Sequence, residues 1–181
     1  MGTVRFDGDR RYNSILYIDP GEKPTGIYGK QALWGWDAEN FTFGTLPGIV
    51  EIAGLRMGFR ICFDVRFPEP FRALYVQGTD LCVVAFSDSA EQPDPARYDQ
   101  ICAHLMTRAV ENVMTVASVN TLSRQQTAPN AVIDPSGRVV LEGRPGEEKL
   151  LVWDVRPAPD TFGSRGRRVN SDRLMAAWKQ Q

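Results

Sequence analysis

Residues 81–86 read LCVVAF, a continuous apolar run typical of a strand buried on both faces. After it, residues 95–113 carry apolar side chains at the spacing of one helix face, with Ile101, Leu105 and Ala109 among them. Residues 113–119 then form a second apolar, strand-like run. Buried strands that alternate with helices predict a layered α/β sandwich rather than an all-α or all-β fold.

Shorter elements are predicted on both sides of this centre. A helix is expected over residues 68–76, with Pro68 in its first turn, and a short terminal helix over residues 171–178. Gly54 separates the two arms of a predicted hairpin, and Pro20-Gly21 and residues 134–137 read as turns. The remaining predicted strands share apolar or alternating patterns bounded by turn residues, and cover residues 12–18, 26–30, 49–53, 55–62, 130–134, 138–141 and 149–155.

Length and composition exclude several classes of protein. The chain has 181 residues, of which 43% are hydrophobic and 24% charged, as expected for one globular domain. Its net charge of −1 offers no electrostatic attraction for nucleic acid or an anionic membrane. No apolar run reaches the roughly 18 residues that a membrane-spanning helix needs. We therefore expect neither a nucleic-acid partner nor a membrane partner.

The cysteines do not indicate a disulfide framework or a metal site. Three cysteines cannot all pair with one another, so a reducing cytoplasm is the expected location. Cys62, Cys82 and Cys102 are far apart in the sequence, and His104 is the only histidine. That set does not have the ligand spacing of a zinc site, and no metal is expected.

The segment with the clearest chemistry is residues 60–72, RICFDVRFPEPFR. Cys62 closes an apolar strand just before a turn and a helix. In that position a thiol can project at the sheet edge while backbone N–H groups point at an incoming oxygen. A single cysteine in an apolar strand is more often a structural residue, because free cysteine is among the most buried residue types. The neighbouring residues decide between the two interpretations.

Residues 58–69, GFRICFDVRFPE, resemble the nucleophile motif of the carbon–nitrogen hydrolase family, also called the nitrilase superfamily. That motif is a glycine-containing strand, then Ile-Cys-Tyr or Phe-Asp, then Arg-Phe-Pro-Glu. Residues 27–34, IYGKQALW, resemble the Tyr-x-Lys-x-x-Leu segment that supplies the family's catalytic lysine. Glu39 and residues 41–44, FTFG, resemble the Glu and Phe-x-x-Gly that follow it.

The resemblance extends over residues 12–154. Residues 107–112, TRAVEN, resemble the family's Arg-Ala-x-Glu-Asn helix, and Asn120 and the turn at 134–137 follow in family order. Residues 127–130 depart from the Gly-His-Ser-type segment of many members, which leaves the substrate subclass open.

By this resemblance, Cys62 is the nucleophile. Lys30 and the backbone N–H of Phe63 would hold the oxyanion, and Lys30 would place a positive charge near the thiol. Glu39 corresponds to a second glutamate that helps position Lys30, although Asp37 lies close by in the sequence. The substrate pocket would include Phe86, Ser87 and Asp88. Asp64, Arg66 and Glu69 are expected to hold the turn after Cys62 through buried ion pairs. Arg108 and Glu111 are expected to be structural, and Asn13 and Asn120 to satisfy backbone groups near the site.

The family's four-layer α-β-β-α sandwich is the fold that the resemblance implies. Residues 1–156 would form about two thirds of one hydrolase domain, and residues 157–181 a C-terminal tail able to pack on a partner subunit. The implied reaction is hydrolysis of a non-peptide carbon–nitrogen bond in a small amide or carbamoyl compound through a cysteine thioester. Nitrile hydrolysis stays open. No cofactor is implied, and a cytoplasmic homo-oligomer, a dimer or higher, is expected.

One catalytic group of the family has no counterpart in the sequence. The general-base glutamate lies on an early strand in the family, well before the segment that matches Tyr12, and neither Asp7 nor Asp9 lies in an apolar strand. We therefore expect an N-terminally truncated domain, either a fragment or a natural short form, with little activity by itself. The alternative is an inactive nitrilase-like binding or assembly module.

Overall fold

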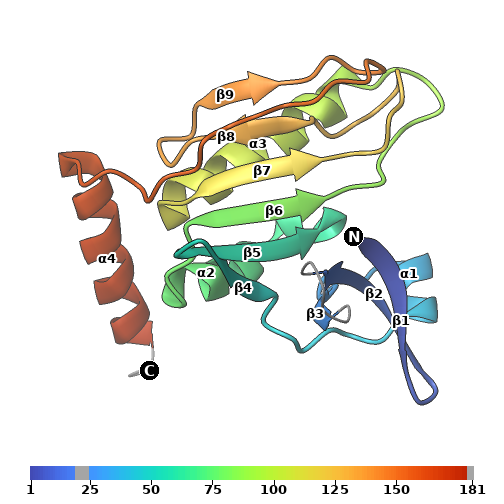
Figure 1. Cartoon of the computed structure of the whole chain (residues 1–181), viewed down its shortest axis with the longest axis horizontal. Helices are drawn as coiled ribbons and strands as arrows, with labels where there is room; N and C mark the ends of the chain where they lie inside the picture. Colours follow the sequence, from blue (N-terminus) through green and yellow to red (C-terminus); the bar gives the residue numbers. More distant parts are fainter. Residues whose placement is uncertain (19–24, 179–181) are drawn as a thin grey trace.

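The computed structural model describes residues 1–18 and 25–178, and their strands form two sheets (Figure 1). The three-stranded one, called the small sheet, is antiparallel in the order β1-β2-β3. Its strands are β1 (Gly2–Asp7), β2 (Arg10–Tyr17) and β3 (Thr25–Gly29). β2 and β3 confirm two predicted strands, whereas the predicted turn at Pro20-Gly21 lies outside the described residues.

The second sheet, called the large sheet, has the order β4-β5-β6-β7-β8-β9 in the described part of the chain. Its strands are β4 (Ile49–Ile52), β5 (Leu55–Ile61), β6 (Leu81–Ala85), β7 (Thr115–Val119), β8 (Ala131–Ile133) and β9 (Val139–Glu142). β5, β6 and β7 are parallel, and the other neighbours pair antiparallel. β6, which was predicted from residues 81–86 as a strand buried on both faces, is therefore central to this sheet.

Two helices connect the parallel strands and cover one face of the large sheet (Figure 1). They are α2 (Pro68–Val76) and α3 (Pro95–Asn112), both close to the predicted ranges. Their apolar faces bury Phe71, Leu74 and Leu105 completely, against Val84 and Val116 of the sheet. Burial of each such side chain contributes about 1.5–3 kcal/mol, so this interface is the main core.

The small sheet packs against the carboxyl-terminal ends of β5 and β6. Ile15 and Tyr28 of the small sheet form a second apolar cluster with Ile61 at the end of β5, and Phe59 and Ala85 pack against it. The short helix α1 (Trp36–Asn40) lies beside this sheet (Figure 1). Helices, large sheet and small sheet thus form the layers of the predicted α/β sandwich, and the fold class is confirmed.

The predicted turns have the backbone that their sequences require. Ala53 and Gly54 both have positive φ, 51° and 77°, as in a type I′ turn, and they join β4 to β5. In the turn between β8 and β9, the carboxylate of Asp134 accepts hydrogen bonds from the N–H groups of Ser136 (2.8 Å) and Arg138 (3.0 Å). Gly137 occupies the left-handed position of that turn, with φ of 81°.

Three predictions differ from the structure. β1 was not expected, because its residues lack a clear apolar face: Val4 and Phe6 are 45% and 67% exposed. Residues 149–155 form no strand. Leu150 and Val152 are 85% and 71% exposed, so the apolar alternation of this segment does not reflect a buried strand face. The terminal helix begins earlier than expected, as α4 (Phe162–Trp178).

Helix α4 packs on its own chain. Arg72 of α2 donates to Ser171 (3.1 Å), and the hydroxyl of Tyr75 donates to the carboxylate of Asp172 (2.9 Å). Packing of the tail on a partner subunit stays a prediction. Among the helices of the described residues, none has the length and apolar character needed to cross a membrane.

Gly44 allows the loop after α1 to touch β3, and its replacement by alanine is expected to destabilise the fold. A Cβ at this position would lie 2.0 Å from the carbonyl oxygen of Gly29, a backbone atom that cannot rotate away. We expect Gly44→Ala to lower the free energy of unfolding by about 1–3 kcal/mol, the usual cost of overpacking. Urea denaturation measures it. Gly2→Ala is the matched control, because nothing lies within 4 Å of its Cβ position.

Candidate active site

Cys62 lies where β5 ends and the short 3₁₀ helix η1 (Cys62–Arg66) begins. Its φ of 46° is in the left-handed region, which costs a non-glycine residue about 1–3 kcal/mol. Such strain persists only when the surrounding structure enforces it. The residue is half-buried and lines a cavity, so the turn presents the thiol to a pocket as the motif predicts.

Asp64 holds this turn together from inside. Its side chain is completely buried, and its oxygens accept from the Tyr28 hydroxyl (2.7 Å) and the Ile61 N–H (2.8 Å). They also accept from the N–H groups of Ala32 (2.7 Å) and Gln31 (3.3 Å), which follow Lys30. One carboxylate therefore joins the segment of the lysine to the turn of the cysteine. Burial and the charge of Asp64 both raise the pKa of Tyr28, so its hydroxyl stays a donor.

Lys30 is fixed directly after β3. Its N–H donates to the carbonyl of Asn13 (2.8 Å), and its own carbonyl accepts from the N–H of Gly44 (3.0 Å). The side chain is only 6% exposed, and its ammonium group forms an ion pair with Asp37 of α1. A buried ammonium group needs such a partner.

Glu39 was predicted to help position Lys30, but it does not make the ion pair with Lys30 in this structure, and its catalytic role stays a prediction. Glu39 is exposed, and Asp37 makes the ion pair instead. The two residues are two positions apart in α1, so they point in nearly opposite directions around the helix. Only one of them can face Lys30, and sequence spacing did not show which.

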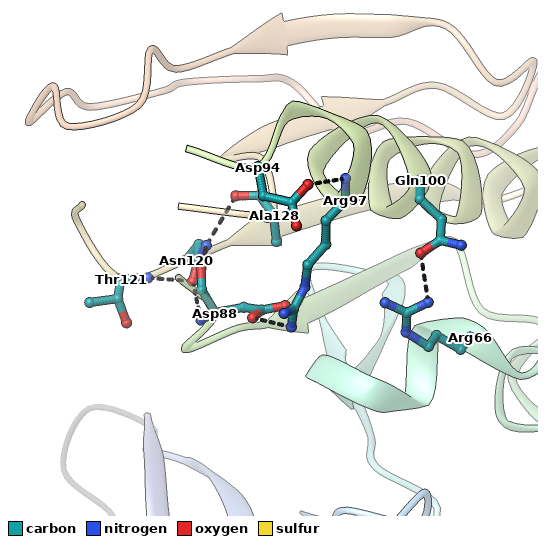
Figure 2. A network of polar contacts seen from close by, with 8 residues as sticks. All are labelled: Arg66, Asp88, Asp94, Arg97, Gln100, Asn120, Thr121 and Ala128. Atoms are coloured by element: carbon teal, nitrogen blue, oxygen red, sulfur yellow. Dashed lines mark hydrogen bonds and ion pairs between the residues drawn. The ribbon is translucent and has the colours of Figure 1, made fainter. Parts of the chain in front are cut away.

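The pocket around Cys62 has a volume of about 610 Å³. Phe86 and Ser87, two of the predicted pocket residues, line it. The third, Asp88, is not among the lining residues and pairs with Arg97 (Figure 2). Residues of both sheets, of α1 and of the loops line the cavity, including Gly2, Thr3, Val4, Asn13, Ser14, Ile15, Lys30, Trp36, Asp37, Phe41, Ile61, Cys62, Ala85, Phe86 and Ser87.

Burial raises the pKa of the Cys62 thiol above its ordinary value. The positive charge of Lys30 and the N–H of Phe63 lower that pKa in part, while the carboxylates of Asp88 and Asp37 raise it. The net direction is upward, so Lys30 does not by itself produce a thiolate. Because Asp37 compensates the ammonium charge, a nucleophilic role for this sulfur would require that its proton be removed during attack.

The supporting residues of the motifs hold the turn in ways that only partly match expectation. Arg108 of α3 donates to the carbonyl of Val65 in η1 (3.0 Å) and pairs with Glu111, as a structural role requires. Asp64 is satisfied by neutral donors rather than by the expected buried ion pair. Arg66 is not in a buried ion pair either, since it donates to Gln100 (2.9 Å) at the exposed surface (Figure 2).

Asn120, at the end of β7, satisfies backbone groups as predicted. Its side chain accepts from the N–H of Asp88 (2.9 Å) and donates to the carbonyls of Asp88 (2.8 Å) and Ala128 (3.0 Å) (Figure 2). Asn13 lines the pocket. In the described part of the chain, no cluster of three histidine, cysteine or acidic side chains could hold a metal ion.

A family model for carbon–nitrogen hydrolases matches residues 1–158. This chain belongs to the carbon–nitrogen hydrolase family. A 2-oxoglutaramate amidase of Bacillus subtilis is 34% identical over 156 residues, which are 83% of this chain and 57% of the relative. The chain thus spans little more than half the length of that relative.

Solved structures of the family show the same fold. A carbon–nitrogen hydrolase superfamily protein of Xanthomonas campestris, with an arsenic adduct in its active site, matches 98% of this chain and 67% of its own, with a TM-score of 0.69 at 23% identity. An amidase mutant of Nesterenkonia sp. AN1 matches 82% of this chain and 57% of its own, with a TM-score of 0.61 at 26% identity. The active-site cysteine of that mutant carries a Michael adduct of acrylamide.

Proposed function

We propose that the protein hydrolyses the carbon–nitrogen bond of small amides or carbamoyl compounds, with Cys62 as the nucleophile. The observation that carries this proposal is the meeting of Cys62 and the Lys30–Asp37 pair in one pocket, although the three residues come from different elements. A thiol, a buried cation and a carboxylate around a cavity are the groups that acyl transfer to sulfur needs.

In the first half of the reaction, the sulfur of Cys62 attacks the carbonyl carbon. A carbon–sulfur bond forms, and the electron pair of the carbonyl bond moves to oxygen. The ammonium group of Lys30 and the N–H of Phe63 stabilise that oxyanion. Collapse of the tetrahedral intermediate breaks the carbon–nitrogen bond, and the nitrogen leaves as ammonia or an amine. Water then attacks the thioester in the same way and releases the acid.

The thiol proton must pass to a base and on to the leaving nitrogen. In the family this base is a glutamate on a strand that precedes the segment matching Tyr12. Among the described residues that line the pocket, Asp37 is the carboxylate available for the transfer. Its negative charge acts on the Cys62 thiol, as the raised pKa of that thiol indicates.

The pocket favours a small substrate with an uncharged acyl group. Much of its described lining is apolar or aromatic, with Trp36, Phe41 and Phe86 as the largest side chains. Lys30 is the basic residue in that lining, and its charge is already compensated by Asp37. We therefore propose short neutral amides ahead of 2-oxoglutaramate, whose carboxylate would find no free cation among the described lining residues.

Ammonia release from neutral amides, N-carbamoyl compounds, nitriles and 2-oxoglutaramate tests the proposal. Turnover of an uncharged amide is expected, with loss of at least 1,000-fold in kcat for Cys62→Ala, since the attacking atom is removed. Mass spectrometry after incubation with acrylamide is expected to find the adduct on Cys62. Cys82→Ala is the control, because that thiol is fully buried and burial raises its pKa to about 12. Equal hydrolysis by the protein and by Cys62→Ala would overturn the proposal.

The alternative function is a binding or assembly module without turnover. The raised pKa of the Cys62 thiol favours it, because a resting thiol without a base is a poor nucleophile. Equal, slow alkylation of Cys62, Cys82 and Cys102 by iodoacetamide at neutral pH, together with no hydrolysis, would support the module. A homo-oligomer and a cytoplasmic location stay predictions, and light scattering tests the first.

A further inference from the structure

Asp88 lies at the same edge of the large sheet as Cys62, because β5 and β6 are parallel and pair Ile61 with Ala85 at their ends. It follows Phe86 and Ser87, which line the cavity, and its own side chain is 12% exposed. Its carboxylate acts on the Cys62 thiol through space, in the direction that disfavours the thiolate. A carboxylate this deeply placed needs a compensating partner, and the structure supplies one from another element.

That partner is Arg97, in the first turn of α3. Its guanidinium group donates to the Asp88 carboxylate at 2.6 Å (Figure 2). The N-cap residue of the same helix, Asp94, accepts from the backbone N–H of Arg97 at 3.0 Å. The start of the helix therefore determines where Arg97 lies, and it places the guanidinium group opposite Asp88.

The backbone of Asp88 is held independently of its side chain. The Asn120 amide accepts from the Asp88 N–H and donates to the Asp88 carbonyl, and the Thr127 N–H donates to the same carbonyl (3.1 Å). Thr121 also donates to the hydroxyl of Ser87 (3.2 Å). A change of charge at position 88 should therefore leave the loop in place, so the effect of charge can be measured separately from that of loop structure.

Charged side chains around Cys62 are compensated either by an opposite charge or by neutral hydrogen-bonding groups. Lys30, directly after β3, compensates Asp37 of α1, and Arg97 of α3 compensates Asp88 of the loop after β6. On the turn of Cys62 itself, Asp64 is surrounded by N–H and hydroxyl donors. In β5, the guanidinium group of Arg60 donates to the carbonyls of Phe59 (2.6 Å), Pro47 (3.2 Å) and Pro70.

We propose that Arg97 is a positioning residue for the reaction of Cys62: by pairing with Asp88 it neutralises a carboxylate at the sheet edge that carries Cys62 and keeps the sulfur reactive near neutral pH. The role rests on the proposed function, in which Cys62 is the nucleophile. Arg97 itself does not line the described pocket and acts through Asp88.

The test is the pH profile of Cys62 alkylation by iodoacetamide, followed by peptide mass spectrometry, which needs no substrate. Arg97→Gln leaves the charge of Asp88 unpaired and is expected to lower the rate at pH 7.5 about threefold, with a shift of the profile to higher pH. Asp88→Asn removes that charge and is expected to raise the rate about threefold, with a shift to lower pH. The double variant should behave as Asp88→Asn.

Arg165→Gln is the matched control, because it breaks the exposed Arg165–Asp160 pair (3.2 Å) on and beside α4 and should leave the profile unchanged. Shifts of opposite sign in the two single variants support the proposal. Unchanged profiles, or shifts of the same sign, overturn it. If Arg97→Gln does not fold, Arg97→Lys should match the parent protein and Asp88→Asn still decides. Opposite shifts without any hydrolysis would refute the proposed function and leave the charge pairing established.

Discussion

Lys30→Met is expected to lower kcat for amide hydrolysis by at least about 100-fold, the usual effect of losing one oxyanion donor. Lys30 is 6% exposed and held at both backbone groups, so its ammonium group is positioned before substrate arrives. In its absence the Asp37 carboxylate stays in the pocket without a partner. The loss of the ammonium group and the unpaired charge of Asp37 both disfavour negative charge on the sulfur and on the oxyanion.

The pH dependence of the same variant has a definite sign. The charge of Lys30 lowers the pKa of the Cys62 thiol, so its removal must raise that pKa further above the ordinary value. Alkylation of Cys62 should therefore be slower than in the parent protein at neutral pH and recover as the pH rises. Lys149→Met, at an exposed lysine, is the control. Retention of more than about a tenth of kcat would contradict the assigned role.

Asp64→Ala is expected to lower the free energy of unfolding by about 3–5 kcal/mol, because several hydrogen-bond donors lose their acceptor and each buried unsatisfied donor costs about 1–3 kcal/mol. Four donors, from Tyr28, Gln31, Ala32 and Ile61, would lose an acceptor that is itself completely buried. Because typical domains have only about 5–15 kcal/mol in total, the variant should be close to unfolding at room temperature.

Urea denaturation followed by circular dichroism measures this loss. Asp160→Ala is the matched control, because its carboxylate is 64% exposed and its ion pair with Arg165 should contribute little. A loss below about 1 kcal/mol for Asp64→Ala would show that the donors find other acceptors, and that Asp64 does not join the lysine segment to the cysteine turn.

Local patterns predicted the centre of the fold well. The apolar run at 81–86 corresponds to β6, and the helical spacing at 95–113 corresponds to α3. Each element begins where predicted and ends one residue earlier. Most of β6 and one face of α3 are buried, and this burial requires the apolar patterns that are visible in the sequence. β1 was missed because it is largely exposed, and an exposed strand leaves no such signal.

Predictions that depended on contacts between segments far apart in the sequence were less successful. The pattern at residues 149–155 is compatible with a strand, but a strand needs a neighbouring strand to pair with. This segment pairs with neither sheet, and Leu150 and Val152 are exposed. Glu39 and Asp37 are equally acidic and close together in sequence. The orientation of α1 alone decides that Asp37 meets Lys30.

The sequence by itself determined that a cysteine closes a buried strand, that a lysine follows another, and that both lie in motifs of one hydrolase family. Only the tertiary structure decided which carboxylates pair with Lys30 and Arg97, and that the Cys62 thiol is more strongly affected by burial than by its neighbouring cation. The physical reason is that chain-local patterns record hydrophobic burial, whereas charge compensation depends on distances and desolvation between segments far apart in the chain.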